Sequence, residues 1–93
     1  MIHPDEQKGF IINADASGRA ICSVLLQERD DGGFSIVSTA SKVLNQNEQR
    51  YTTCEKELLA IVYALQRFRI YTYGRKVTLF TDDSTFHFYM VAS

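Results

Sequence analysis

Residues 52–68 read TTCEKELLAIVYALQRF, and this run sets how the other segments of the 93-residue chain can be arranged. Thr52 and Glu55 have the Thr-x-x-Glu spacing of a capping box, which predicts that a helix begins there. Apolar residues then recur at helical spacing, at Leu58, Ile61, Val62, Leu65 and Phe68. We therefore expect one helix of about four turns with this apolar stripe facing a sheet. Tyr71 and Gly74 mark its exit.

Three β-prone segments precede the helix. Residues 10–15, FIINAD, are followed by a small-residue turn at 16–19. Residues 20–27, AICSVLLQ, and 34–39, FSIVST, flank Asp30-Asp31-Gly32-Gly33, which is a strong hairpin signal. These features predict three successive antiparallel strands. We expect the polar residues 41–49 to be irregular.

Residues 76–81, KVTLFT, form another apolar run after the helix. A strand that follows a crossover helix lies parallel to the first strand, with a right-handed connection. The predicted fold is therefore α/β, with three antiparallel strands plus a parallel strand in one mixed sheet, and residues 1–93 form a single domain. Residues 83–93 give a mixed signal that favours the first turns of another helix.

Three acids stand at the ends of these elements. Asp15 and Asp82 end the first and the parallel strand, which would place them side by side, and Glu57 lies near the start of the helix. Carboxylate oxygens gathered at one rim of a sheet suit a hard cation. Each acid also has an ordinary interpretation, Asp15 as a turn residue, Glu57 as an acid favoured by the helix dipole, and Asp82 as a helix cap.

Composition narrows the class of protein. Ten Lys and Arg against eleven Asp and Glu argue against tight nucleic-acid binding by the isolated chain. Cys22 and Cys54 are too few for a zinc site and are interpreted as reduced thiols. No apolar run approaches the ~20 residues of a membrane span, and the N-terminus is too polar for a signal peptide. We expect an intracellular protein, cytoplasmic or nuclear, with no membrane partner.

Two side-chain groups near the helix exit have alternative interpretations. A basic cluster could meet a phosphate backbone or merely complement the helix dipole, and it comprises Arg67, Arg69, Arg75 and Lys76. The aromatic residues Phe68, Tyr71 and Tyr73 could stack on bases, but such a cluster is more often core.

The chain resembles the ribonuclease H domain of reverse transcriptases encoded by gypsy-like LTR retrotransposons. The resemblance rests on Asp15-Ala16-Ser17, Leu25-Leu26-Gln27 and Thr81-Asp82 at strand ends, and most specifically on residues 51–60, Tyr-x-x-x-Glu-Lys-Glu-Leu-Leu-Ala. It implies a ribonuclease H-like fold and cleavage of the RNA strand of RNA–DNA hybrids. The joint occurrence of the three acids in this family's order favours the functional interpretation.

The resemblance also implies a role for each acid. Asp15 would bridge two Mg²⁺ ions, with Mn²⁺ as a substitute, while Glu57 and Asp82 would complete the coordination; two such ions ~4 Å apart stabilise the attacking and leaving oxygens. Glu55 lies about 200° round the helix from Glu57, so both cannot face the metals, and we assign Glu55 to capping.

The chain departs from this family towards its C-terminus. A further acid expected on a C-terminal helix has no candidate here, Asp83 stands where the family often has His, and the pattern is lost from Ser84 onward. We expect a C-terminally incomplete domain that is weak or inactive alone. Its expected partners are the RNA–DNA hybrid, the rest of a reverse transcriptase polyprotein, and a second copy bound through an uncovered face. The alternative is a non-catalytic protein-interaction or scaffolding module.

Overall fold

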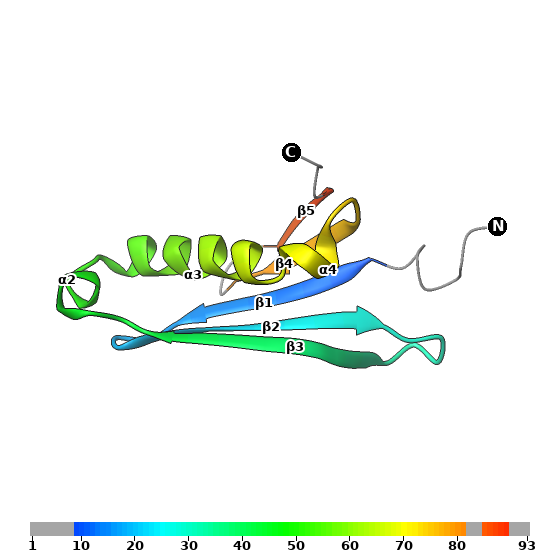
Figure 1. The fold of residues 1–93 in the computed structure, drawn as a ribbon, viewed down its shortest axis with the longest axis horizontal. Helices are drawn as coiled ribbons and strands as arrows, with labels where there is room; N and C mark the ends of the chain where they lie inside the picture. Colours follow the sequence, from blue (N-terminus) through cyan, green and yellow to red (C-terminus); the bar gives the residue numbers. More distant parts are fainter. Residues whose placement is uncertain (1–8, 82–84, 90–93) are drawn as a thin grey trace.

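The structure is a computed structural model that describes residues 9–81 and 85–89. A mixed five-stranded sheet has the order β3-β2-β1-β4-β5, and helix α3 lies across one of its faces (Figure 1). The elements are β1 Phe10–Ala16, β2 Ala20–Glu28, β3 Phe34–Val43, α2 Gln46–Gln49, α3 Thr53–Arg67, α4 Arg69–Thr72, β4 Lys76–Phe80 and β5 Thr85–Tyr89.

The expected sheet is confirmed. Strands β1, β2 and β3 pair antiparallel in sequence order. Gly32 has a φ of 88° in the β2–β3 turn, a backbone conformation that favours glycine. Strand β4 pairs parallel with β1, with Phe10 opposite Val77 and Asn13 opposite Phe80. The crossover helix and the parallel strand therefore make this an α/β fold of the expected kind.

The predicted start of α3 is confirmed. The Thr52 side chain accepts from the Glu55 N–H at 3.1 Å, and Glu55 Oε1 accepts from the Thr52 N–H at 3.0 Å. The Thr52 backbone N–H that donates to this carboxylate is the largest cause that holds the pKa of Glu55 below its ordinary value, and the Thr52 side chain adds to it. Glu55 is thus the capping acid, as expected, and Glu57 is the acid left for another role.

The predicted apolar face of α3 is partly wrong. The fully buried side chains are Ala60, Ala64 and Phe68, whereas Leu58 is 61% exposed and Val62 is 43% exposed. The sheet already fills the core with large side chains, so a helix that packs closely against it contributes small ones. Ile61 and Leu65 stay half-buried at the edge of this contact.

Three further expectations are corrected. Strand β3 continues to Val43, beyond the predicted end at residue 39. The stretch expected to be irregular contains helix α2, because Asn45 and Glu48 form a second capping box. Residues Thr85–Tyr89 form strand β5, antiparallel to β4, where we expected a helix. The rest of 83–93 lies outside the described residues. The β-branched and aromatic content of β5 favours an extended strand.

Glu48 gives a pH-dependent prediction. Its carboxylate accepts from the Asn45 N–H at 3.0 Å and from Lys42 Nζ at 2.9 Å, and the backbone hydrogen bond is the larger cause that lowers its pKa from the ordinary 4.5. Because the pKa is lower in the folded chain, the ionised carboxylate stabilises the fold at pH values above its unfolded-state pKa. This stabilisation is lost as the pH falls through the folded-state pKa. Glu48→Gln should therefore destabilise the chain at neutral pH. In urea unfolding, the difference from wild type should shrink below pH 4.5, and an equal difference at both pH values would contradict this account.

Candidate functional site

Asp15 is the next-to-last residue of β1. Phe10, Ile12 and Ala14 are buried beneath α3, so strand alternation places Asp15 on the side of the sheet that α3 leaves open. Its side chain is exposed, and Oδ1 accepts from the Ala16 N–H at 2.9 Å. The carboxylate therefore stands at the rim of the sheet, and within residues 9–81 and 85–89 its only hydrogen bond is the one that Oδ1 accepts.

Glu57 lies on the sheet-facing stripe of α3. The positions of Thr53, Glu57, Ala60 and Ala64 recur at three and four residues, and the last two are fully buried. Glu57 is one turn before the first of them and is half-buried. Within the described residues, no hydrogen bond or ion pair satisfies its carboxylate. A half-buried carboxylate at this position supplies oxygen atoms of the kind that bind hard cations.

Asp15 and Glu57 are at the same end of the molecule. Helix α3 starts beside the β1–β2 turn and runs back along β1 (Figure 1). Thr53 lines a cavity together with Ala16, Ser17 and Gly18. From Thr53 to Glu57 the helix advances about 6 Å, which equals about two strand residues. Glu57 is therefore level with the end of β1, and it approaches the rim from the side opposite Asp15.

Asp82 lies outside the described residues, so its predicted place beside Asp15 stays a prediction. The register between β1 and β4 is regular as far as Asn13 and Phe80, two residues before each aspartate. Among the described residues, no three His, Cys, Asp or Glu side chains form a group that could hold a metal ion. The donor set is nevertheless of the kind that Mg²⁺ prefers, because it consists of carboxylate oxygens.

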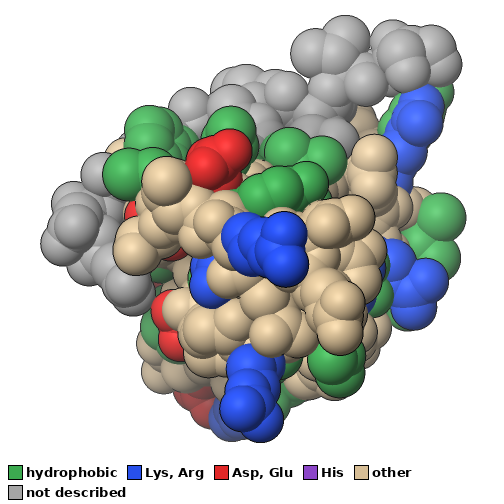
Figure 2. All heavy atoms as spheres, turned by 90° about the vertical axis from the view of Figure 1, so that its left-hand side faces the viewer, with side chains coloured by type: hydrophobic (Ala, Val, Ile, Leu, Met, Phe, Trp, Pro, Cys, Tyr) green, Lys and Arg blue, Asp and Glu red, His purple; other side chains and the backbone are tan. Residues whose placement is uncertain are grey.

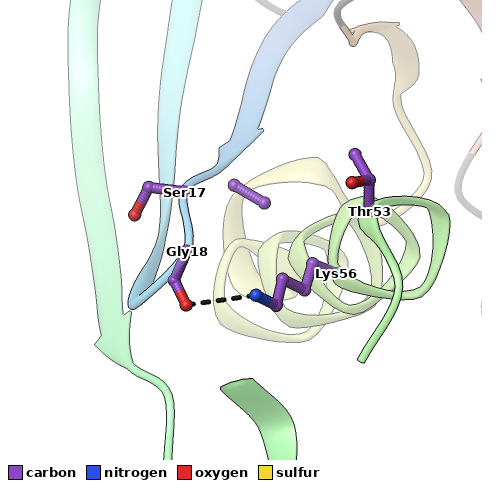
Figure 3. Close-up of a pocket in the computed structure, with 5 residues that line it drawn as sticks. Ser17, Gly18, Thr53 and Lys56 are labelled. Carbon is purple, nitrogen blue, oxygen red and sulfur yellow. Dashed lines mark hydrogen bonds between the residues drawn. The ribbon is translucent and has the colours of Figure 1, made fainter. Parts of the chain in front are cut away.

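Lys56 is a residue to which the sequence analysis gave no role. Its Nζ donates to the Gly18 carbonyl at 3.1 Å, which joins the first turns of α3 to the β1–β2 turn (Figure 3). The two segments enclose a cavity of about 150 Å³ lined by Ala16, Ser17, Gly18, Thr53 and Lys56. Lys56 lies between the capping Glu55 and Glu57, inside the Glu-Lys-Glu part of the motif at residues 51–60, and this place in the motif was the signal available in the sequence.

The end of the molecule near this cavity carries both signs of charge. Figure 2 shows Lys and Arg side chains beside Asp and Glu side chains on this face, without one sign dominating the view.

Cys22 is exposed and directly opposite Asp15 in the β1–β2 register, and both it and Cys54 are free cysteines. The expectation of unpaired thiols is thus confirmed.

The basic and aromatic groups near the helix exit lie at the other end of α3. Arg67, Arg69 and Arg75 lie over the rings of Tyr63, Tyr73 and Phe10, with guanidinium carbons 6.0, 5.9 and 5.7 Å from the ring centroids. Phe68 lies in the core, as expected for an aromatic cluster at a helix exit. The same expectation is wrong for Tyr71 and Tyr73, which are 40% and 48% exposed.

Comparison with solved structures defines the class of the fold. The chain is similar to the foamy viral protease-reverse transcriptase in complex with double-stranded DNA, with a TM-score of 0.72 and 21% identity over 83% of this chain and 16% of that one. It is also similar to the same protein in complex with an RNA/DNA hybrid, with a TM-score of 0.66 and 18% identity over 82% of this chain and 10% of that one. These likenesses establish a ribonuclease H-like fold.

Sequence comparison then gives the family. Residues 5–93 match the RNase H-like domain found in reverse transcriptase, and the chain belongs to this family. It is 40% identical over 87 residues to the retrovirus-related Pol polyprotein from transposon gypsy of Drosophila melanogaster, covering 92% of this chain and 8% of that protein. It is 38% identical over 91 residues to the Pol polyprotein from transposon 412 of the same organism, covering 96% of this chain and 7% of that protein.

The chain thus spans less than a tenth of these curated relatives. In the part of the chain that the structure describes, none of the helices has the length and apolar character needed to cross a membrane.

Proposed function

We propose that the chain is the nuclease module of a retroelement reverse transcriptase polyprotein and that it cuts the RNA strand of RNA–DNA hybrids inside the cell. Asp15, Glu57 and Asp82 are the proposed catalytic residues and metal ligands. The observation that carries the proposal is the placement of Asp15 and Glu57, which reach the same end of the sheet from its two sides. A phosphodiester bound at this rim would meet both carboxylates at once.

Divalent cations, Mg²⁺ or Mn²⁺, would supply Lewis-acid stabilisation of the charge that develops on the phosphate oxygens. The chain's own residues set the geometry of their binding. Asp15 has one oxygen engaged by the Ala16 N–H, which fixes the orientation of its carboxylate. The burial of Ala60 and Ala64 fixes the height of Glu57 above the sheet. Rigid elements on both sides hold the ligands before the substrate arrives.

The direct test of this function is strand-specific cleavage. A polyprotein that carries the chain is incubated with an RNA–DNA hybrid labelled on either strand, and with duplex DNA and duplex RNA of the same sequence. We expect cutting of the RNA strand of the hybrid in Mg²⁺ or Mn²⁺, and none after chelation. Equal cutting of all duplexes, or cutting that survives chelation, would contradict the proposal.

Asp15→Asn should raise the melting temperature in the absence of metal and remove most of the stabilisation that Mg²⁺ gives to wild type. In metal-free buffer it removes one charge from an acidic cluster, so we expect the melting temperature to rise by roughly 2–4 °C. The asparagine oxygen can still accept from the Ala16 N–H. Millimolar Mg²⁺ should stabilise wild type and leave the variant almost unchanged. Differential scanning fluorimetry measures both, and a metal-free decrease would count against convergence of the acids.

A second candidate function is a non-catalytic interaction module. Ile11, Leu26 and Ile36 form a cross-strand row on the sheet face that α3 leaves open, and Ile36 is 68% exposed. An apolar groove lined by Ile61, Leu65, Leu79 and Phe86 adds to the uncovered surface. Exposed apolar surface of this kind marks protein contacts, including those of a second copy. Mg²⁺-independent self-association that Ile36→Lys abolishes, together with absence of hybrid cleavage, would favour this function.

A further inference from the structure

We infer that Lys56 is a positioning residue, which holds the start of α3 against the β1–β2 turn and so sets the spacing between Glu57 and Asp15. This inference rests on the proposed function. It concerns a residue that is not itself a metal ligand and touches neither carboxylate in the contacts described.

The contact joins two segments that are far apart in sequence. Lys56 Nζ and the Gly18 oxygen are 3.1 Å apart, across a separation of 38 residues. Lys56 immediately precedes Glu57, and Gly18 is three residues beyond Asp15. The lysine is half-buried, so its aliphatic stem is held between the two segments. A movement of the turn away from the helix would break this contact.

The turn is a suitable anchor because it is already rigid. Ser17 N–H donates to the Ala20 carbonyl at 2.8 Å, and Ser17 Oγ donates to the same oxygen at 3.1 Å. Ser17 Oγ also accepts from the Ala20 N–H at 3.1 Å. The Leu44 N–H donates to the Arg19 carbonyl at 2.8 Å, which fixes the turn to the end of β3 as well. Gly18 therefore keeps its carbonyl in one place.

The helix is equally well defined on its side of the contact. The capping box fixes the first turn at Thr52 and Glu55, and the next residue is Lys56. Near this level Leu58 is 61% exposed, Leu59 is half-buried against the core, and the first fully buried side chain is Ala60. Apolar packing of Leu59 and Ala60 therefore holds α3 on the sheet, and the Lys56 hydrogen bond adds a directional contact between the helix end bearing Glu57 and the β1–β2 turn.

The sign of its effect on metal binding separates positioning from simple charge. Lys56 is a cation near two carboxylates, so its charge alone opposes the binding of Mg²⁺ or Mn²⁺. If charge were its main influence, Lys56→Met would strengthen binding. If Lys56 positions the ligands, Lys56→Met weakens binding. Without the lysine contact, part of the free energy of metal binding is used to order the start of α3 against the β1–β2 turn.

The test measures Mn²⁺ affinity by isothermal titration for five forms of the chain: wild type, Lys56→Met, Lys56→Arg, Lys76→Met and Asp15→Asn. Lys76 is an exposed lysine at the start of β4, at the opposite end of the sheet, so Lys76→Met is the charge-matched control. We expect Lys56→Met to bind about three- to tenfold more weakly, as loss of a charge-assisted hydrogen bond implies. Lys56→Arg keeps a donor and should bind near wild type.

The outcomes distinguish this inference from the proposed function. If wild type binds Mn²⁺, Asp15→Asn does not, and Lys56→Met binds as well as or better than wild type, positioning by Lys56 is overturned and the metal site stands. If wild type binds no Mn²⁺, both are overturned. If Lys76→Met weakens binding as much as Lys56→Met, the effect is not specific to this contact, and the inference is again overturned. Circular dichroism of each variant checks that it is folded.

Discussion

Asp15→Asn should lower the rate of RNA-strand cleavage roughly a thousandfold in a polyprotein that carries the chain, because losing a cation clamp costs about 4 kcal/mol of transition-state stabilisation. A neutral amide oxygen is a much weaker ligand than a carboxylate. The substitution preserves the volume of the side chain and its acceptor for the Ala16 N–H. The fold should therefore be intact while the activity is lost, and single-turnover cleavage of a labelled hybrid measures the effect.

Glu55→Gln is the matched control for this prediction. It removes one negative charge from the same end of the molecule, two residues from Glu57, and glutamine can still accept from the Thr52 N–H. We expect cleavage close to the wild-type rate, whereas Glu57→Gln should resemble Asp15→Asn. If Glu55→Gln and Asp15→Asn reduced cleavage equally, net charge rather than ligation would explain the loss.

Phe68→Ala should have the largest effect on stability. Phe68 is 1% exposed and ends α3 inside the core. Truncation of a buried Phe costs about 3–5 kcal/mol, while a domain of this size has only about 5–14 kcal/mol in total. The melting temperature should fall by roughly 12 °C or more, measured by circular dichroism. Gross loss of helix at room temperature is the extreme form of the same result.

Ile70→Ala tests whether that loss comes from burial. Ile70 is an apolar residue two positions further on, in α4, and it is 83% exposed. Its truncation removes little buried area, so we expect a change within about 0.5 kcal/mol. A comparable loss of stability from both variants would mean that this region packs differently from the structure described.

The fold could be predicted largely because its signals are local. The Thr52–Glu55 capping box defined the start of α3, and the Asp30 to Gly33 run defined the hairpin. The parallel pairing of β1 with β4 follows from the handedness of the crossover, which general chain geometry dictates. The prediction was wrong about which side chains of α3 are buried. Helical periodicity favoured the large apolar residues, whereas α3 packs Ala60 and Ala64 against a sheet whose own large side chains fill the core.

The candidate site could be predicted less completely. Strand and helix ends indicated that Asp15 and Glu57 belong to one end of the sheet, and in the structure the segment that follows β1 and the first turns of α3 line one cavity there. The face of the sheet to which each acid belongs was not predicted. It depends on which set of alternating β1 side chains α3 covers, and this is decided only when the helix packs on the sheet. Contacts such as Lys56 with Gly18 join residues 38 positions apart. No local pattern encodes such a contact, since it arises only when the two elements pack.

The central claim is that Asp15, Glu57 and Asp82 share one cation site. Paramagnetic broadening by Mn²⁺ tests it most directly, because broadening falls steeply with distance from the ion. Substoichiometric Mn²⁺ is added to the isotope-labelled chain, and the signals of all three residues are followed together. We predict that all three broaden at the same Mn²⁺ concentration and recover together when Mg²⁺ is added. Broadening at one acid while another stays sharp, or separate titrations for each, would contradict the shared site.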